Sequence, residues 1–261
     1  TVTMSTATTV VPSPSPIAIC DEDAIQDGLH PFNLGALVTP QLLNGLPSGL
    51  AADYYLSFAD ALVEKNKIGP IFTNTQAFQQ TIYTRIKNGL DCYGITPVTL
   101  VVNTFDPVNF EEETTFLCSG SNLNLSVDSG FSSYLWNTGA TTAAITVQQA
   151  GTYTITVTND KGCKKTKTFI VKASEKAIYE NAVVKDFAGN KNTITIQYKG
   201  TGDYEFSLDG TSYQDNATFT NVAPGSYTIS IRDKNGCGIT TSDLIYVLDY
   251  PRFFTPNGDG F

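Results

Sequence analysis

The sequence of 261 residues contains only one histidine, one tryptophan and one methionine. It has 16 lysines and arginines, fewer than its 25 acidic residues. The net charge of −9 argues against nucleic acid or an anionic membrane surface as a partner. No apolar run approaches the ~20 residues that a membrane-spanning helix needs. No charged and then apolar signal segment opens the chain, so we expect the signal of an exported protein to lie upstream.

Motifs of catalysis are also missing. The sequence has no nucleophile elbow, no zinc-protease motif, no P-loop and no dinucleotide-binding fingerprint. His30 is followed by a proline and has no triad pattern around it. The acidic residues are scattered among turns, where aspartate and asparagine serve the backbone. We therefore expect no catalytic residues and a protein that is not an enzyme.

What the chain does have is a repeated hairpin. The segment 151–163 (GTYTITVTNDKGC) recurs without a gap at 225–237 (GSYTISIRDKNGC), and a looser copy lies at 81–92 (TIYTRIKNGLDC). Alternating Thr, Ile, Val and Tyr indicate a strand, and Asn, Asp and Gly supply the turn. A second strand-like run follows each copy. Self-similarity at about 70 residues indicates tandem modules.

These repeats predict an all-β chain of tandem Ig-like or PKD-like β-sandwich modules joined end to end, with only short helical turns. Residues 1–16 are interpreted as the end of a preceding module and a proline-rich linker. The modules are then expected at 17–103, 104–174 and 175–249, and residues 250–261 begin another domain. Within the first module, Phe32–Val38 is expected to be a strand and Ala59–Lys65 a helical turn or two.

The second module carries an Ig-like signature. Cys118, Trp136 and Cys163 follow one another in the order Cys, Trp, Cys, and Tyr153 stands where a tyrosine corner would lie. Cys163 falls in the turn after the strand, whereas an antibody domain has its cysteine inside the strand. In the third module Phe206 takes the place of the tryptophan.

The five cysteines are spaced like disulfide partners more than like zinc ligands. Cys20 and Cys92 bracket the first module, and Cys118 and Cys163 bracket the second. We expect these four to form disulfides, each worth about 4 kcal/mol in the chain-entropy model. Cys237 is expected to be unpaired within the chain. Five buried free thiols are the alternative.

The sequence suggests two possible binding sites and leaves a structural alternative for each. Asp21, Asp23 and Asp27 form an acidic cluster of the kind that binds Ca²⁺ weakly in extracellular modules, although the EF-hand spacing is absent and a solvated loop is the alternative. Apart from Ca²⁺, no cofactor is expected. Aromatic side chains could also form a carbohydrate platform or simply pack in the sandwich. The candidates by residue type are Tyr54, Tyr55, Tyr134, Tyr204 and Tyr213.

The tail carries a resemblance to a known family. Phe254-Thr-Pro-Asn-Gly-Asp-Gly260 resembles the opening of the gliding-motility-associated C-terminal domain, which is the type B sorting signal of the type 9 secretion system in Bacteroidetes. The motif residues are Thr255, Pro256, Asn257, Gly258, Asp259 and Gly260. The modules before it resemble the repeats of large secreted adhesins of that system, SprB-like proteins included. The family's sorting domain continues well beyond this motif.

The resemblance implies a secreted, non-catalytic stalk segment of a cell-surface adhesin with a role in adhesion or gliding motility. It also implies type 9 secretion machinery as a partner, a PorP/SprF-like outer-membrane partner for the C-terminal domain, and attachment at the outer membrane. The adhesive ligand, a surface glycan or another molecule, is not identified by the sequence. The alternative is a set of Ig-like spacer or carbohydrate-binding modules of a secreted polysaccharide-degrading enzyme.

Overall fold

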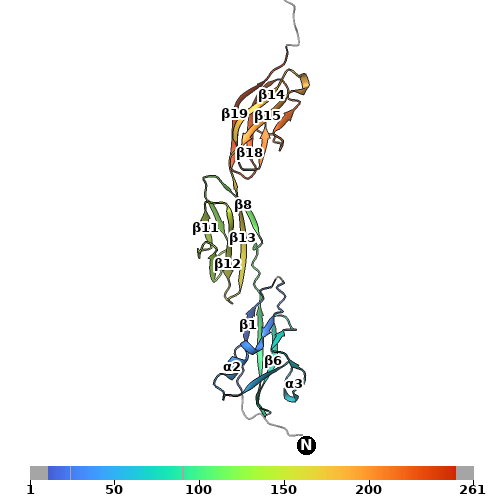
Figure 1. Cartoon of the computed structure of the whole chain (residues 1–261), viewed down its shortest axis with the longest axis vertical. Coiled ribbons are helices and arrows are strands. Elements are labelled where there is room, and N and C mark those ends of the chain that lie inside the picture. Colours follow the sequence, from blue (N-terminus) through green and yellow to red (C-terminus); the bar gives the residue numbers. More distant parts are fainter. Residues whose placement is uncertain (1–10, 24, 90, 251–261) are drawn as a thin grey trace, which may run out of the picture. The chain divides into compact units, whose positions relative to one another are not determined.

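A computed structural model describes residues 11–23, 25–89 and 91–250 (Figure 1). The chain is an all-β protein of tandem Ig-like modules, as the alternating sequence pattern predicts, and its helices are single turns or little more. No helix in these ranges is long and apolar enough to cross a membrane. The sorting motif Thr255–Gly260 lies outside the described residues.

The chain divides into two compact units. One comprises residues 1–110, 128–141 and 155–167, and the other comprises residues 111–127, 142–154 and 168–261. Every sheet falls within one of the three predicted modules, yet the division passes through the middle one. The module boundaries therefore stay a prediction, and we use the terms first, second and third module for residues 17–103, 104–174 and 175–249.

The first module is built on a five-stranded sheet in which a long hairpin is flanked on both sides. The strand order is β1 (Ile17–Cys20), β7 (Asp91–Asn103), β6 (Gln79–Asn88), β3 (Ala51–Tyr55) and β4 (Lys67–Ile68). Strand β1 pairs with β7 in parallel, and the remaining neighbours are antiparallel. A second, two-stranded sheet pairs β2 (Pro31–Asn33) with β5 (Ile71–Thr73).

Short helices connect these strands. The predicted strand Phe32–Val38 ends at Asn33, because the Asn33 side chain accepts a hydrogen bond from the amide of Ala36 and so caps α1 (Leu34–Leu37). Helix α2 spans Thr39–Leu43. The predicted helical turn near Ala59–Lys65 is confirmed as α3 (Phe58–Val63), which Ser57 caps through the amide of Asp60.

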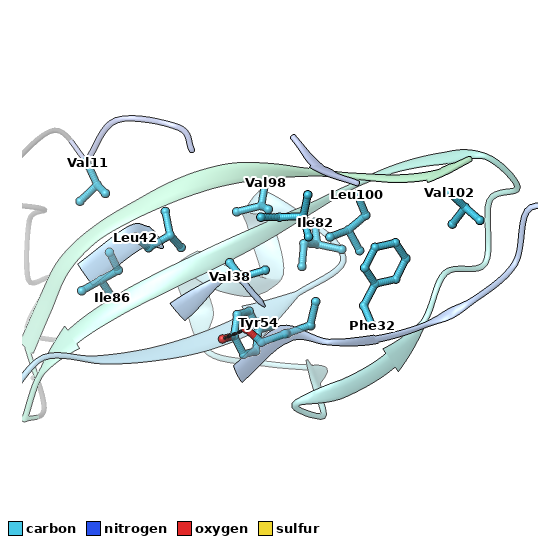
Figure 2. Packing of buried hydrophobic residues seen from close by; sticks show 12 residues of the cluster. Val11, Phe32, Val38, Leu42, Tyr54, Ile82, Ile86, Val98, Leu100 and Val102 are labelled. Atoms are coloured by element: carbon cyan, nitrogen blue, oxygen red, sulfur yellow. Dashed lines mark hydrogen bonds between the residues drawn. The ribbon is translucent and has the colours of Figure 1, made fainter. Parts of the chain in front are cut away.

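The core of the first module contains residues of the five-stranded sheet, of strand β2 and of the helical segments α1 and α2. Figure 2 shows Val11, Leu42 and Ile86 at one end of this core and Val102 at the other. Val11 is buried there, so the chain reaches the first module at the end where the hairpin β6–β7 turns. The opposite end of β7 leads into the second module.

The second module has a four-stranded sheet in the order β10 (Ser133–Trp136), β12 (Gly151–Thr158), β13 (Lys164–Ser174) and β8 (Glu113–Cys118). Its two-stranded sheet pairs β9 (Leu123–Ser126) with β11 (Ala144–Val147). As in the first module, the first strand, β8, pairs in parallel with the last, β13.

The third module has two three-stranded sheets. One is ordered β14 (Ile178–Lys185), β15 (Thr193–Lys199), β17 (Thr218–Thr220), and the other β16 (Tyr204–Ser207), β18 (Gly225–Asp233), β19 (Gly238–Val247). A 3-10 turn, η1, covers Gly189–Lys191. Phe206 is buried in the core of this module, which confirms that it takes the place of Trp136, itself buried in the second.

Tyrosine corners confirm the likeness of the second and third modules to Ig domains. The hydroxyl of Tyr153 donates to the carbonyl of Gln149 at 2.9 Å, and that of Tyr227 donates to the carbonyl of Ala223 at 2.8 Å. Both bonds return to the residue four positions upstream of the tyrosine, as a tyrosine corner requires. The two copies of the repeat that align without a gap thus share one local structure.

A buried carboxylate links three strands of the first module. Asp53 on β3 forms ion pairs with Lys67 on β4 and Lys87 on β6. Burial raises the pKa of the Asp53 carboxyl. The hydrogen bonds and charges of the two lysines lower this pKa by more than burial raises it, so that the net shift is downward. Because the folded pKa lies below the unfolded one, these pairs stabilise the fold above about pH 4 and lose that effect as the pH falls.

We expect the free energy of unfolding of the oxidised protein to fall as the pH is lowered from 5 to 3, and the Asp53→Asn variant to depend less on pH over this range. Lys87→Gln, which removes one of the two cations, should give an intermediate dependence. Urea unfolding followed by circular dichroism at each pH measures this. Equal slopes for the three proteins would contradict the role assigned to Asp53.

Candidate functional site

The candidate functional site of this chain is a pair of disulfides that join successive modules. Cys20 is bonded to Cys163, 143 residues away, and Cys118 is bonded to Cys237, 119 residues away. We call the first the N-terminal disulfide and the second the C-terminal disulfide. Each lies within one of the two compact units. They are built from equivalent parts.

The first cysteine of each bond ends the first strand of a module. Cys20 closes β1 and pairs in register with Asn103, and the next amide, that of Asp21, donates to the Asn103 carbonyl at 2.8 Å. Cys118 closes β8 in the same way opposite Ser174, and the amide of Ser119 donates to the Ser174 carbonyl at 2.9 Å. Parallel pairing with the last strand therefore places each cysteine where the chain leaves its module.

The second cysteine of each bond follows the hairpin turn of the next module. In the second module, the side-chain oxygen of Asn159 accepts hydrogen bonds from the amides of Lys161 and Cys163. The amide of Asn159 in turn donates to the Cys163 carbonyl at 2.9 Å. The sulfur of Cys163 lies 3.9 Å from the carbonyl oxygen of Asn103, so the turn meets the segment that leaves the first module.

A buried carboxylate organises the C-terminal disulfide. One oxygen of Asp233 accepts from the amide of Cys237 at 3.0 Å and from the hydroxyl of Ser174 at 2.9 Å, and the other accepts from the amide of Asp203 at 3.2 Å. Asp233 is 2% exposed. It therefore ties the turn to the segment that leaves the second module, as Asn159 holds the equivalent turn.

The predicted pairing within modules is wrong. Cys92 lies eleven residues before Asn103, the strand partner of Cys20, and Cys163 lies eleven residues before Ser174, the partner of Cys118. At ~3.3 Å per residue of strand, the members of each expected pair are about 36 Å apart. Disulfides need Cα atoms about 4.4–6.8 Å apart, and the observed bonds have 5.4 and 5.3 Å.

Two individual cysteine assignments are corrected as well. Cys237, expected to be unpaired, is bonded to Cys118, and Cys92, expected to be bonded, is a buried free thiol. The sequence shows that Cys163 and Cys237 follow hairpin turns, but it does not show that the first strand of a module pairs in parallel with the last. That pairing puts the two cysteines of a module at opposite ends, and the observed bonds join neighbouring modules.

The acidic cluster does not form the expected calcium site. The carboxylates of Asp21, Asp23 and Asp27 each accept a hydrogen bond from a backbone amide of their own loop, from Gly28, Ile25 and Leu29 respectively. Lys164 and Lys165 line the same surface hollow as Asp21 and Asp23, and their charges oppose a cation there. Within the described ranges, no three His, Cys, Asp or Glu residues are placed to hold a metal ion.

The tyrosines considered for carbohydrate binding do not form one surface. Tyr54, Tyr55 and Tyr204 are buried in the cores, and the hydroxyl of Tyr54 donates to the carbonyl of Leu34. The guanidinium of Arg232 lies over the ring of Tyr213, 3.9 Å from its centre. The tyrosines that were selected by residue type are thus partly core residues and partly separate surface residues.

One family model matches the chain. Residues 16–107 match the Flavobacterium inter-domain disulphide bond domain, a range that contains the first module and both Cys20 and Cys92. No curated protein matches the sequence.

Comparison with solved structures finds proteins with Ig domains. The crystal structure of murine CEACAM1b has 12% sequence identity and a TM-score of 0.38, and the match covers 52% of this chain and 96% of that one. The titin domains I67–I69 (an E-to-A variant) have 9% identity and a TM-score of 0.31, with 78% and 89% covered. The eight N-terminal Ig domains of Down syndrome cell adhesion molecule have 11% identity and a TM-score of 0.31, with 86% and 33% covered.

The disulfides indicate where the protein works. Disulfides persist in oxidising surroundings such as the periplasm and the cell exterior. The match with a family named for an inter-domain disulphide bond agrees with this location. The chain thus belongs to an extracellular protein with Ig-like β modules.

We expect Asp233→Ala to lower the free energy of unfolding of the third module by about 3 kcal/mol, because it leaves several buried donors without an acceptor. The C-terminal disulfide should also reform more slowly after reduction, since the turn no longer holds Cys237 in place. Urea unfolding and mass-spectrometric timing of reoxidation measure the two effects.

Asp215→Ala is the matched control, because the Asp215 side chain is exposed and its ion pair with Lys234 lies at the surface. It should change the stability by less than about 1 kcal/mol. The N-terminal disulfide is an internal control and should reform at the same rate in both variants. A general slowing of both disulfides would contradict a local role for Asp233.

Proposed function

We propose that the chain is a non-catalytic, load-bearing stalk segment of a cell-surface adhesin, and that its two disulfides set how far it can be stretched. The observation that carries this proposal is the overlap of the two disulfide loops. The N-terminal disulfide closes residues 20–163, and the C-terminal disulfide closes residues 118–237. Since the loops share residues 118–163, the bonds act together on one covalent path.

The overlap shortens that path several-fold. From Cys20 to Cys237 the backbone runs 217 residues (237 minus 20). The shortest covalent route crosses from Cys20 to Cys163, returns along the backbone to Cys118 and crosses to Cys237, which is 45 residues (163 minus 118). At ~3.5 Å per residue, the limit of extension falls from about 760 Å to about 160 Å.

The same route decides which strands can carry the load. Residues 21–117 and 164–236 lie off the route and include β2–β7 of the first module and β14–β18 of the third. Once the bonds are taut, unfolding these residues adds no length. Strands β9, β10, β11 and β12 of the second module lie on the route, so that force can unravel them. Strands β1 and β19 lie on the segments between the route and the chain ends, and force can draw them out as well.

The finer parts of the proposal follow from the tail. Export by the type 9 secretion system, a sorting domain beginning near Thr255–Gly260, and retention through a PorP/SprF-like outer-membrane partner would place the stalk at the cell surface in adhesion or gliding. What supports them is the resemblance of the tail motif and the family match of the first module. A limit on stretching suits an anchored protein that is pulled during adhesion.

We expect single-molecule stretching between the chain ends to give four different contour lengths. Relative to the oxidised protein, Cys20→Ser with Cys163→Ser should add 53 residues, about 185 Å, because the route then runs directly from Cys20 to Cys118. Cys118→Ser with Cys237→Ser should add 29 residues, about 100 Å. Full reduction should add 172 residues, about 600 Å.

The two double variants are matched controls for one another, since each removes one bond and two sulfurs. Loops that did not overlap would add residues equal to their own sizes, 143 for the N-terminal disulfide and 119 for the C-terminal disulfide, and such gains would contradict the route. If the oxidised protein extends as far as the reduced protein, the disulfides do not limit its length and the load-bearing function fails.

A further inference from the structure

Cys92 is the third member of a series whose other two members are bonded. It directly follows the turn of the looser hairpin copy, as Cys163 and Cys237 follow the turns of the other two. Cys92 lies eleven residues before Asn103, and Cys163 lies eleven residues before Ser174; these two residues pair with the cysteines that end β1 and β8. Cys92 therefore occupies in the first module the place that Cys163 occupies in the second.

The side chains also face the same way. Along β7, Cys92 belongs to the buried alternate set that includes Val98, Leu100 and Val102. Along β13, Phe169 and Val171 are buried, and Cys163 lies on the same side by the period of two. Both cysteines thus project inward at the end of the module where the hairpin turns.

The chain enters every module past this turn. In the second module the Asn103 carbonyl lies 3.9 Å from the Cys163 sulfur. In the third, the Ser174 hydroxyl donates to Asp233 at 2.9 Å, beside Cys237. In the first, Val11 and Ile86 share one core cluster, and the strand pairing places Cys92 opposite Lys87, next to Ile86 (Figure 2). In the two later modules the entering segment brings the bonded cysteine of the preceding module with it.

We propose that Cys92 forms a third inter-module disulfide with a cysteine that ends the first strand of a β module lying N-terminal to the first module. The two thiols form one S–S bond and lose two protons and two electrons, which reduce the disulfide of a thiol–disulfide oxidant to its dithiol. Residues 175–249 contain no cysteine besides Cys237, so the third module has none that could bond to a following module. A further bond of this series can therefore only involve Cys92 and a module before the first. The bond would lengthen the series of overlapping loops by one.

The test is disulfide mapping of the whole protein taken from the surface of the cells that produce it. The protein is denatured with iodoacetamide present and without reductant, digested, and analysed by mass spectrometry. We expect the Cys92 peptide to be crosslinked to a peptide from N-terminal of residue 1. The Cys20–Cys163 and Cys118–Cys237 peptides in the same digest show that native bonds were preserved.

Several results would overturn the proposal: a carbamidomethylated Cys92 peptide, a bond to Cys92 of a second copy, a bond to another protein, or an adduct with a small thiol. A Cys92→Ser variant of the whole protein is the matched control. It should lose that one crosslinked pair and keep the other two disulfides. Mapping tests the bond alone, whereas stretching tests the load-bearing function, so that the two can fail separately.

Discussion

Parallel pairing between the first and last strands of a module is the constraint on which the disulfide pattern depends. It holds Cys20 beside Asn103 and Cys118 beside Ser174, at the end where the chain leaves the module. The hairpin turn of the same module, with its own cysteine, lies at the other end of an eleven-residue run of strand. The cysteines at the two ends of a module cannot bond to each other. The cysteine that ends the first strand is bonded instead to the turn cysteine of the next module.

This geometry leads to disulfide bonds between modules and, among the described cysteines, to none within a module. Each inter-module bond spans more than a hundred residues, and in the chain-entropy model loops of this size stabilise the folded state by about 5 kcal/mol each. Because the two loops share residues 118–163, their effects are not independent and the two figures do not simply add. The more direct consequence is mechanical, since the overlap fixes the length of the covalent path whatever the stability of the sheets.

Side chains at the turns support this arrangement. Asn159 and Asp233 stand at the same place in the two copies of the repeat, and both accept a hydrogen bond from the amide of the following cysteine. Asp233 also binds the hydroxyl of Ser174, on the segment that arrives from the preceding module. The turn is therefore ordered around the cysteine and, at the C-terminal disulfide, around the strand end that carries its partner.

The sequence by itself determined the local structure. The alternating residues predicted the hairpins, and Tyr153 predicted the tyrosine corner. Trp136 and Phe206 predicted the buried aromatic residue of the second and third modules. Each of these features depends on residues only a few positions away. The tertiary structure alone decided which cysteines are bonded and that Asp21, Asp23 and Asp27 bind their own loop. A disulfide needs two Cα atoms within a few ångströms, and that distance is set by strand register and module order, over more than a hundred residues of chain.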